Sequence, residues 1–140
     1  MEQITSKDNK KIKHVLQLYK RKYRQTYKEY VAEGYRTVVD MIPMGHVRYV
    51  LAKGSMGVEA GLQELCETYH VDLNVVDDSL WKGMDATVHG QGVLAVVCQK
   101  ESRLEDFIVH PNGLYLLVDG IQDPGNMGTL IRTAVGAGVK

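Results

Sequence analysis

The chain has 140 residues, which is enough for one domain with or without part of a second. Its 44% hydrophobic and 24% charged residues exclude a disordered chain, and its short apolar runs exclude a bilayer-spanning helix. The net charge of zero is unevenly distributed: residues 1–28 hold nine Lys or Arg and two acidic residues, and residues 29–140 hold eight and fifteen. This asymmetry favours a polyanionic partner such as nucleic acid, although a merely solvated helix face remains the alternative.

The first predicted element is a helix over residues 8–24, started by Ser6 or Asp8. Apolar residues at helical spacing predict a buried stripe of Ile12, Val15, Leu16, Tyr19 and Tyr23. Tyr19 and Tyr23 can also stack on bases, but their place on this stripe favours core packing. The opposite side gathers five basic residues: Lys10, Lys13, Lys20, Arg21 and Arg24. Residues 1–28 are therefore expected to form a basic helical arm.

Residues 29–105 are predicted to form an α/β domain, because strand-like and helix-like segments alternate around a mostly parallel or mixed sheet. Strands are expected at residues 30–32, 46–52, 71–76 and 93–97, and helices at residues 36–41, 58–69 and 80–84. Residues 85–92 read as a polar connection.

The Cys, His and Trp residues of this domain are not expected to form a functional site. Cys66 and Cys98 are too few for a disulfide framework and suit a reducing cytosol. Cys66 and His70 are four apart, but no second ligand pair exists, so no metal site is expected. Trp81 is expected in the core, and His89 is expected to be exposed rather than bound to RNA.

Residues 106–140 are expected to contain a linker and the start of a second domain. The apolar run at 114–118 predicts a strand covered on both faces, and the Asp-Pro-Gly-Asn run at 123–126 predicts a turn in which Asn126 caps a helix. Gly138 is placed to end that helix. One of its faces is expected to pack through apolar residues: Met127, Leu130, Ile131, Ala134 and Val135.

The same predicted helix has a second face that carries almost no side chains. Gly128, Arg132 and Gly136 are spaced four residues apart. Each interior glycine costs roughly 0.8–1 kcal/mol relative to alanine, so something is expected to approach the backbone there. A ligand held by Arg132 and close packing of another helix or strand both fit this pattern.

This closing stretch resembles the first conserved motif of the SpoU/TrmH family of RNA 2'-O-ribose methyltransferases, in the SPOUT superfamily. The matching residues are Asp119, Asp123-Pro124, Asn126, Gly128, Arg132, Ala134 and Gly138, and Gly136 departs from the usual alanine. The N-terminal part is similar to that family's substrate-binding domain, with Gly90 where proline is common. Its matching residues are Ile4-Thr5-Ser6, Asn9, Lys11-Ile12-Lys13, Arg21-Lys22, Arg24, Glu33-Gly34, Arg36 and the segment 91–97.

The resemblance implies a three-layer α/β/α sandwich like that of certain ribosomal RNA-binding proteins, preceded by the basic helix and followed by the first β-α unit of a SPOUT knotted methyltransferase domain. It implies S-adenosylmethionine-dependent methylation of rRNA or tRNA in the cytoplasm by a homodimeric full-length enzyme. The residues that bind the cofactor are expected beyond Lys140, so the chain is expected to be incomplete and inactive by itself. A non-catalytic RNA-binding module is the alternative.

The resemblance also assigns roles to single residues. Asn126 and Arg132 are the implied catalytic residues, although Asn126 alternatively serves as a plain helix cap. The family's arginine is often described as activating the 2'-hydroxyl. A guanidinium hardly releases its proton, so holding the phosphate and stabilising an alkoxide is the easier role for Arg132. The implied RNA-binding residues are Lys10, Lys13, Arg21, Arg24, Arg36 and Gly128, and no residue is assigned to a metal.

Overall fold

The structure is a computed structural model that describes residues 1–84 and 92–139. Residues 85–91 and Lys140 lie outside the described residues, and with them lie His89, Gly90 and nearly all of the expected connection at 85–92. The chain divides into two units, Met1–Lys100 and Glu101–Lys140. The first unit contains both the expected basic arm and most of the expected α/β domain.

The first unit is built on a five-stranded mixed sheet. Its strands are β1 (Glu2–Ile4), β2 (Glu29–Glu33), β3 (Val47–Lys53), β4 (Asp72–Val76) and β5 (Val93–Cys98), in the spatial order β1-β4-β3-β5-β2. Strands β1 and β3 run parallel to β4, whereas β5 runs antiparallel to both β3 and β2. The four predicted strands are confirmed, and β1 is an additional strand that is too short to show a periodic pattern.

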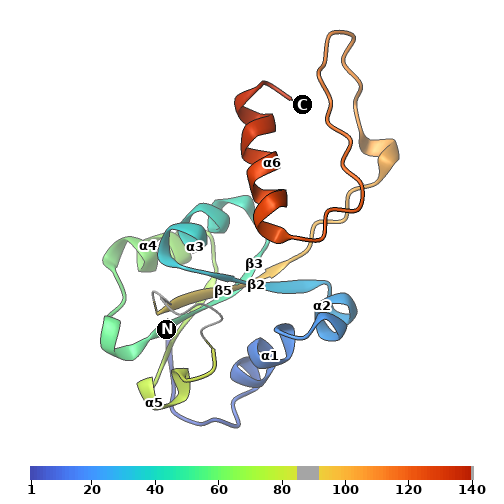
Figure 1. Cartoon of the computed structure of the whole chain (residues 1–140). Coiled ribbons are helices and arrows are strands. Elements are labelled where there is room, and N and C mark those ends of the chain that lie inside the picture. Colours follow the sequence, from blue (N-terminus) through green and yellow to red (C-terminus); the bar gives the residue numbers. More distant parts are fainter. Residues whose placement is uncertain (85–91, 140) are drawn as a thin grey trace. The chain divides into compact units, whose positions relative to one another are not determined.

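Helices cover both faces of this sheet (Figure 1). They are α1 (Lys10–Leu18), α2 (Arg21–Tyr27), α3 (Tyr35–Met41), α4 (Ala60–Thr68) and α5 (Asp78–Trp81). Helices α1 and α5 lie on one face, and α3 and α4 lie on the other. The expected three-layer α/β/α sandwich is therefore confirmed.

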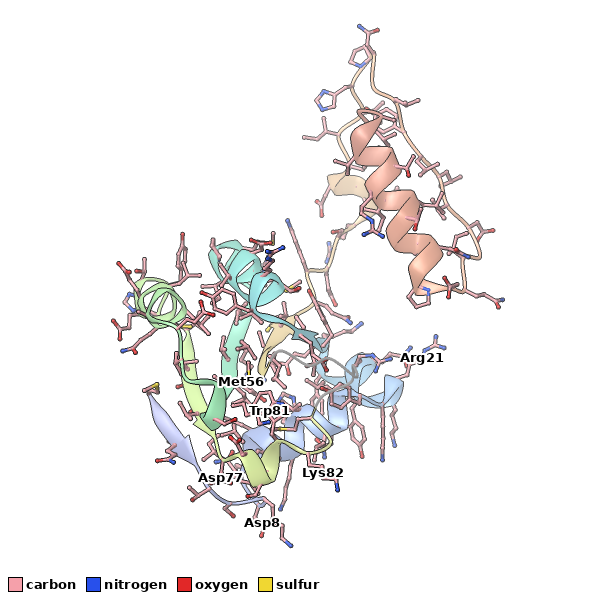
Figure 2. The ribbon with its side chains drawn as sticks, turned by 60° about the vertical axis from the view of Figure 1, so that its left-hand side comes forward. Asp8, Arg21, Met56, Asp77, Trp81 and Lys82 are labelled. Carbon is pink, nitrogen blue, oxygen red and sulfur yellow. The ribbon has the colours of Figure 1, made fainter. Side chains whose placement is uncertain are left out.

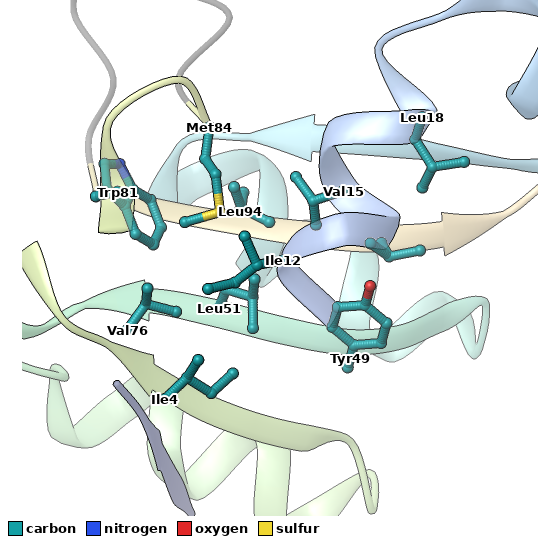
Figure 3. Close-up of a cluster of buried hydrophobic side chains, with 11 residues drawn as sticks. Ile4, Ile12, Val15, Leu18, Tyr49, Leu51, Val76, Trp81, Met84 and Leu94 are labelled. Atoms are coloured by element: carbon teal, nitrogen blue, oxygen red, sulfur yellow. The ribbon is translucent and has the colours of Figure 1, made fainter. Parts of the chain in front are cut away.

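The sandwich has one apolar core on each face of the sheet, because successive strand residues point to opposite faces. Tyr49 and Leu51 of β3 face the α1 side, while Val50 and Ala52 face the α3 side. The α1-side core consists of Ile4, Ile12, Val15, Leu18, Tyr49, Leu51, Val76, Trp81, Met84, Leu94 and Val96, most of which are labelled in Figure 3. Trp81 is buried there, as predicted.

The single helix predicted over residues 8–24 is wrong, because the chain breaks between α1 and α2. Lys20 has an extended backbone (φ −93°, ψ 129°), and Arg24 Nη1 donates hydrogen bonds to the carbonyls of Leu18 (2.9 Å) and Tyr19 (2.8 Å). These contacts satisfy carbonyls that the end of α1 leaves unpaired. The predicted caps are also wrong, since Asn9 caps α1 by accepting from the Lys11 N–H at 2.8 Å.

The buried stripe of this segment also differs from the prediction. Leu18 is buried with 1% exposure, whereas Leu16 is 41% exposed. The face that meets the sheet follows steps of three residues, at 12, 15 and 18, rather than alternating steps of three and four. Tyr19 packs against the core as expected, and its hydroxyl lies within hydrogen-bonding distance of two acceptors, Glu33 Oε1 (2.9 Å) and the Met84 carbonyl. Tyr23 is only half-buried.

The second unit contains a turn at residues 111–112, the short 3-10 helix η3 (Leu104–Asp106) and helix α6 (Pro124–Gly136). The strand predicted at 114–118 is wrong, because the described part of this unit forms no strand. A strand needs a neighbour for its backbone N–H and C=O groups, and this segment has none. Leu114, Leu116 and Leu117 are exposed, Leu117 to 96%.

Candidate functional site

The N-terminus of α6 is organised by Asp123. Its carboxylate accepts a hydrogen bond from the Asn126 N–H at 2.7 Å, and Pro124 occupies the first helical position. The prediction that Asn126 caps the helix is therefore wrong, since Asn126 lies within the first turn. The Asn126 side chain is exposed and is not needed for the cap. It is accordingly available to bind a ligand beside the helix N-terminus.

Removal of this cap gives a direct test. Asp123→Ala is expected to destabilise α6 by about 1 kcal/mol, because it removes the acceptor for an N–H of the first turn. Hydrogen exchange of the α6 amides should accelerate accordingly. Asn126→Ala is the matched control and should have a much smaller effect. An equal or larger acceleration in Asn126→Ala would show that Asp123 is not the cap.

The side-chain-poor face of α6 is open within the second unit. A Cβ placed on Gly136 would have no neighbour within 4 Å, and one on Gly128 would meet only Arg132 Nη2 at 4.0 Å. The Arg132 side chain thus reaches back over the Gly128 turn, toward the helix N-terminus. None of the ion pairs between described residues involves Arg132. This face is therefore open both to a ligand at the guanidinium and to a further packing segment.

The other end of α6 is closed by the predicted glycine. Gly138 has a φ of +76°, which favours glycine, and its N–H donates to the Val135 carbonyl at 3.1 Å. The Val139 N–H donates to the Ala134 carbonyl at 3.0 Å. This pair of bonds is the Schellman motif, so the end of the helix predicted at Gly138 is confirmed.

The predicted RNA-binding cations lie in different settings. Lys10, Lys13 and Arg21 are exposed on α1 and α2, and the Arg21 side chain extends outward from α2 (Figure 2). Lys13 pairs with Asp8 at 2.7 Å, whereas Arg24 is half-buried and bonded to the end of α1. Arg36 is exposed on α3, which covers the opposite face of the sheet. The fold therefore brings the α1 and α2 residues together and separates Arg36 from them.

A groove of about 660 Å³ lies beside this basic surface, within the first unit. It is lined by Lys10, Lys11, Lys13, His14, Gln17, Tyr27, Arg48, Tyr49 and Asp72. Lys10 and Lys13 were predicted from the sequence, but His14, Tyr27 and Arg48 were missed. The spacing of Lys10, His14 and Gln17 on one helix face would have indicated part of this surface. Arg48 carries no local pattern that points to it.

A buried carboxylate supports the groove from below. Glu29 is only 5% exposed, and its Oε1 accepts from Arg48 Nη1 at 2.5 Å. Its Oε2 lies 2.9 Å from His14 Nε2, a close contact but without the geometry of a well-directed hydrogen bond. His14 Nδ1 lies 2.9 Å from the Tyr49 hydroxyl. The Glu29 hydrogen bond raises the pKa of Arg48, and burial raises the pKa of Tyr49, so both groups stay protonated.

Lys11 has a structural role at the rim of the groove. Its Nζ lies 2.5 Å from Asp72 Oδ2 and 2.8 Å from Asn74 Oδ1, and both partners belong to β4. The hydrogen bond from Lys11 lowers the pKa of Asp72. These contacts attach α1 to the sheet.

No helix in the part of the chain that the structure describes is long and apolar enough to cross a bilayer. The described residues hold no group of three or more His, Cys, Asp or Glu side chains arranged to bind a metal ion. Cys66 is buried in the core on the α3 side, and this burial raises the pKa of its thiol.

Comparison with known proteins adds independent information. Residues 9–95 match the model of the MRM3-like substrate binding domain family. The chain is 29% identical to the Bacillus subtilis 23S rRNA (guanosine(2553)-2'-O)-methyltransferase RlmP, over 99% of this chain and 52% of that protein. It is 27% identical to rRNA methyltransferase 3, mitochondrial, of Xenopus laevis, over 93% of this chain and 32% of that protein. The chain thus spans about half and a third of their lengths.

Solved structures resemble the fold. A crystal structure of an RNA 2'-O ribose methyltransferase superposes with a TM-score of 0.73 at 26% identity, over 98% of this chain and 53% of that one. The AdoMet-bound rRNA methyltransferase from Sinorhizobium meliloti gives 0.80 at 24% identity, over 99% and 52%. The second likeness supports the fold alone.

Proposed function

Because this chain belongs to the MRM3-like substrate-binding domain family of the SpoU/TrmH RNA methyltransferases, we propose that it binds RNA for methylation of a ribose 2'-hydroxyl. The observation that carries the proposal is the exposed Arg132 guanidinium, which reaches over the bare Gly128 turn near the N-terminus of α6. The relatives named above act on rRNA, so we propose rRNA, rather than tRNA, as the substrate.

The proposed reaction is an in-line displacement. The ribose 2'-oxygen forms a bond to the methyl carbon, the bond from carbon to sulfur breaks with its electron pair going to sulfur, and the hydroxyl proton leaves. S-adenosylmethionine supplies the methyl group when bound. Arg132, Asn126 and Gly128 offer hydrogen-bond donors and open space rather than an apolar slot for an adenine ring, so they fit a ribose and phosphate, and none is assigned to the cofactor.

Each of these residues has a defined part in the proposal. The Arg132 guanidinium keeps its proton, so it stabilises the negative charge that develops on the 2'-oxygen and holds the adjacent phosphate. The positive end of the α6 dipole adds to this field. The Asn126 amide, exposed in the first turn, orients a ribose or phosphate oxygen. Proton removal is left to another base or to water.

The assay for this function is transfer of a labelled methyl group from S-adenosylmethionine to rRNA by the protein at its natural full length. Label on a ribose 2'-oxygen is expected, and label on a base would contradict the proposal. A non-catalytic RNA-binding module is the second candidate, and it predicts RNA binding without transfer. We also propose a cytoplasmic homodimer, on the family resemblance, and light scattering of the full-length protein tests the dimer.

RNA affinity is expected to depend on salt through the exposed cations of α1 and α2. Arg21→Gln should reduce the slope of log affinity against log salt by about one, because one phosphate contact is lost. Arg24→Gln should instead lower stability, because the Arg24 guanidinium bonds the Leu18 and Tyr19 carbonyls. Fluorescence anisotropy titrations over a series of salt concentrations measure the slope, and an unchanged slope in Arg21→Gln would remove Arg21 from the interface.

A further inference from the structure

The groove described above has the size and lining of a ligand site, within the first unit alone. Its volume of about 660 Å³ falls within the range of small-molecule and cofactor pockets. Its walls come from α1, from the last residue of α2 and from the first residues of β3 and β4. The packing of the core does not explain these polar and aromatic side chains, since they lie outside both core clusters except for Tyr49.

Tyr27 is an exposed aromatic platform on one wall. It is 43% exposed, and its neighbours hold the ring in place. The Tyr23 ring lies nearly parallel to it at 6.0 Å, and His14 meets it edge-on at 5.1 Å. Its hydroxyl donates to Gln17 Oε1 at 3.4 Å. An aromatic ring held in this way presents a stacking surface to an unpaired base.

Cations from two elements line the same groove as Tyr27. Lys10 and Lys13 line the groove from α1, and Arg48 lines it from β3. The ion pair between Lys13 and Asp8 is exposed, so it contributes little to stability. Lys13 can therefore leave Asp8 and bind a phosphate instead. Arg48 uses Nη1 for Glu29 and keeps further N–H donors for a second partner. The charge of the rim therefore complements a polyanion.

The buried Glu29 explains how the donors are fixed. Burial of a carboxylate is costly unless it is paired, and Glu29 is paired with Arg48 and contacts His14. This cluster therefore does more than fill space, because Glu29 anchors Arg48 through a hydrogen bond and contacts His14. A rigid donor loses little freedom when it binds a ligand.

We propose that this groove holds one unpaired nucleotide of the RNA, with its base against Tyr27 and its neighbouring phosphates at Lys10, Lys13 and Arg48. The inference rests on the proposed function, because it takes the ligand to be RNA. It adds a preference for single-stranded over fully paired RNA, since base faces are accessible only when a nucleotide is unstacked.

The test compares Tyr27→Ala with Tyr69→Ala in binding to a single-stranded oligoribonucleotide and to the blunt duplex of the same sequence. Tyr69 is a matched control because it is 46% exposed and lies at the end of α4, outside the groove. Tyr27→Ala is expected to weaken binding to the single strand about tenfold and to leave binding to the duplex unchanged. Tyr69→Ala should change neither affinity.

Further variants separate stacking from folding. Tyr27→Phe keeps the ring and should bind as the unsubstituted protein does. Tyr27→Leu keeps apolar bulk without a π face and should bind as weakly as Tyr27→Ala. If Tyr27→Ala lowers the melting temperature, Tyr27→Leu shows whether the loss of binding comes from lost stacking or from lost stability. Equal affinity of Tyr27→Leu and Tyr27→Phe would overturn the groove proposal while leaving RNA binding intact. Absence of binding to both RNAs by the unsubstituted protein at low salt would instead overturn the proposed function.

Discussion

Arg132→Ala is expected to lower the rate of methyl transfer by about 100- to 1,000-fold in the full-length protein. The reason is the loss of a fixed donor at the oxygen where charge develops, which has this effect in comparable sites. RNA affinity should remain nearly unchanged, because Arg132 is one cation among several phosphate contacts. Single-turnover transfer of a labelled methyl group, measured beside anisotropy titrations of the same RNA, separates the two quantities.

Two controls sharpen the Arg132 experiment. Arg132→Lys keeps the charge but loses the planar fork of donors, so its rate should lie between those of the unsubstituted protein and Arg132→Ala. Thr133→Ala changes the next exposed residue of α6 and should leave the rate unchanged. A large loss of RNA affinity with normal turnover in Arg132→Ala would reduce Arg132 to an ordinary binding residue.

Leu18→Ala is expected to lower the free energy of unfolding by about 2–5 kcal/mol, because it leaves a cavity in the core beneath α1. Leu18 is 1% exposed and packs with Val15 and Leu51 in this core. Leu16→Ala, on the same helix, should change stability by no more than about 0.5 kcal/mol because Leu16 lies at the surface. Urea unfolding followed by circular dichroism measures both variants.

This pair distinguishes the structure from the sequence pattern. The pattern places Leu16 in the core, whereas the structure places Leu18 there. A larger loss for Leu16→Ala would mean that α1 is rotated about its axis relative to the sheet. The slope of free energy against urea should stay constant in both variants, which confirms that the effect lies in the folded state.

The sequence predicted most of the sheet because the central strands carry an unmistakable pattern. The run at 93–97 is apolar on every residue, and both of its faces are covered by helices. Strand β3 could likewise be predicted because Val, Tyr and Leu dominate it. No such pattern marks β1, whose three residues form a strand only because β4 lies beside them.

The predictions that proved wrong or incomplete share a physical cause. Tertiary contacts, rather than the local sequence, decide whether a segment forms a continuous helix or a strand and which side chains meet. The helix break at Lys20 depends on the Arg24 guanidinium folding back onto Leu18 and Tyr19. Apolar composition at 114–118 favours a strand, but a strand exists only with a partner. The Arg48 contact with Glu29 joins residues from β3 and β2, which are separated in the sheet by β5, so no short pattern could have revealed it.

Hydrogen bonds and ion pairs within the protein engage several cations of residues 1–28, and they limit how strongly RNA affinity can depend on ionic strength. Lys11 is committed to Asp72 and Asn74, and Arg24 to two carbonyls. Cations already neutralised by the protein displace few ions from a nucleic acid. The number of ions released on binding is therefore smaller than the nine Lys and Arg residues among 1–28 imply, so the RNA affinity should fall less steeply with salt than that of an unfolded peptide of equal charge.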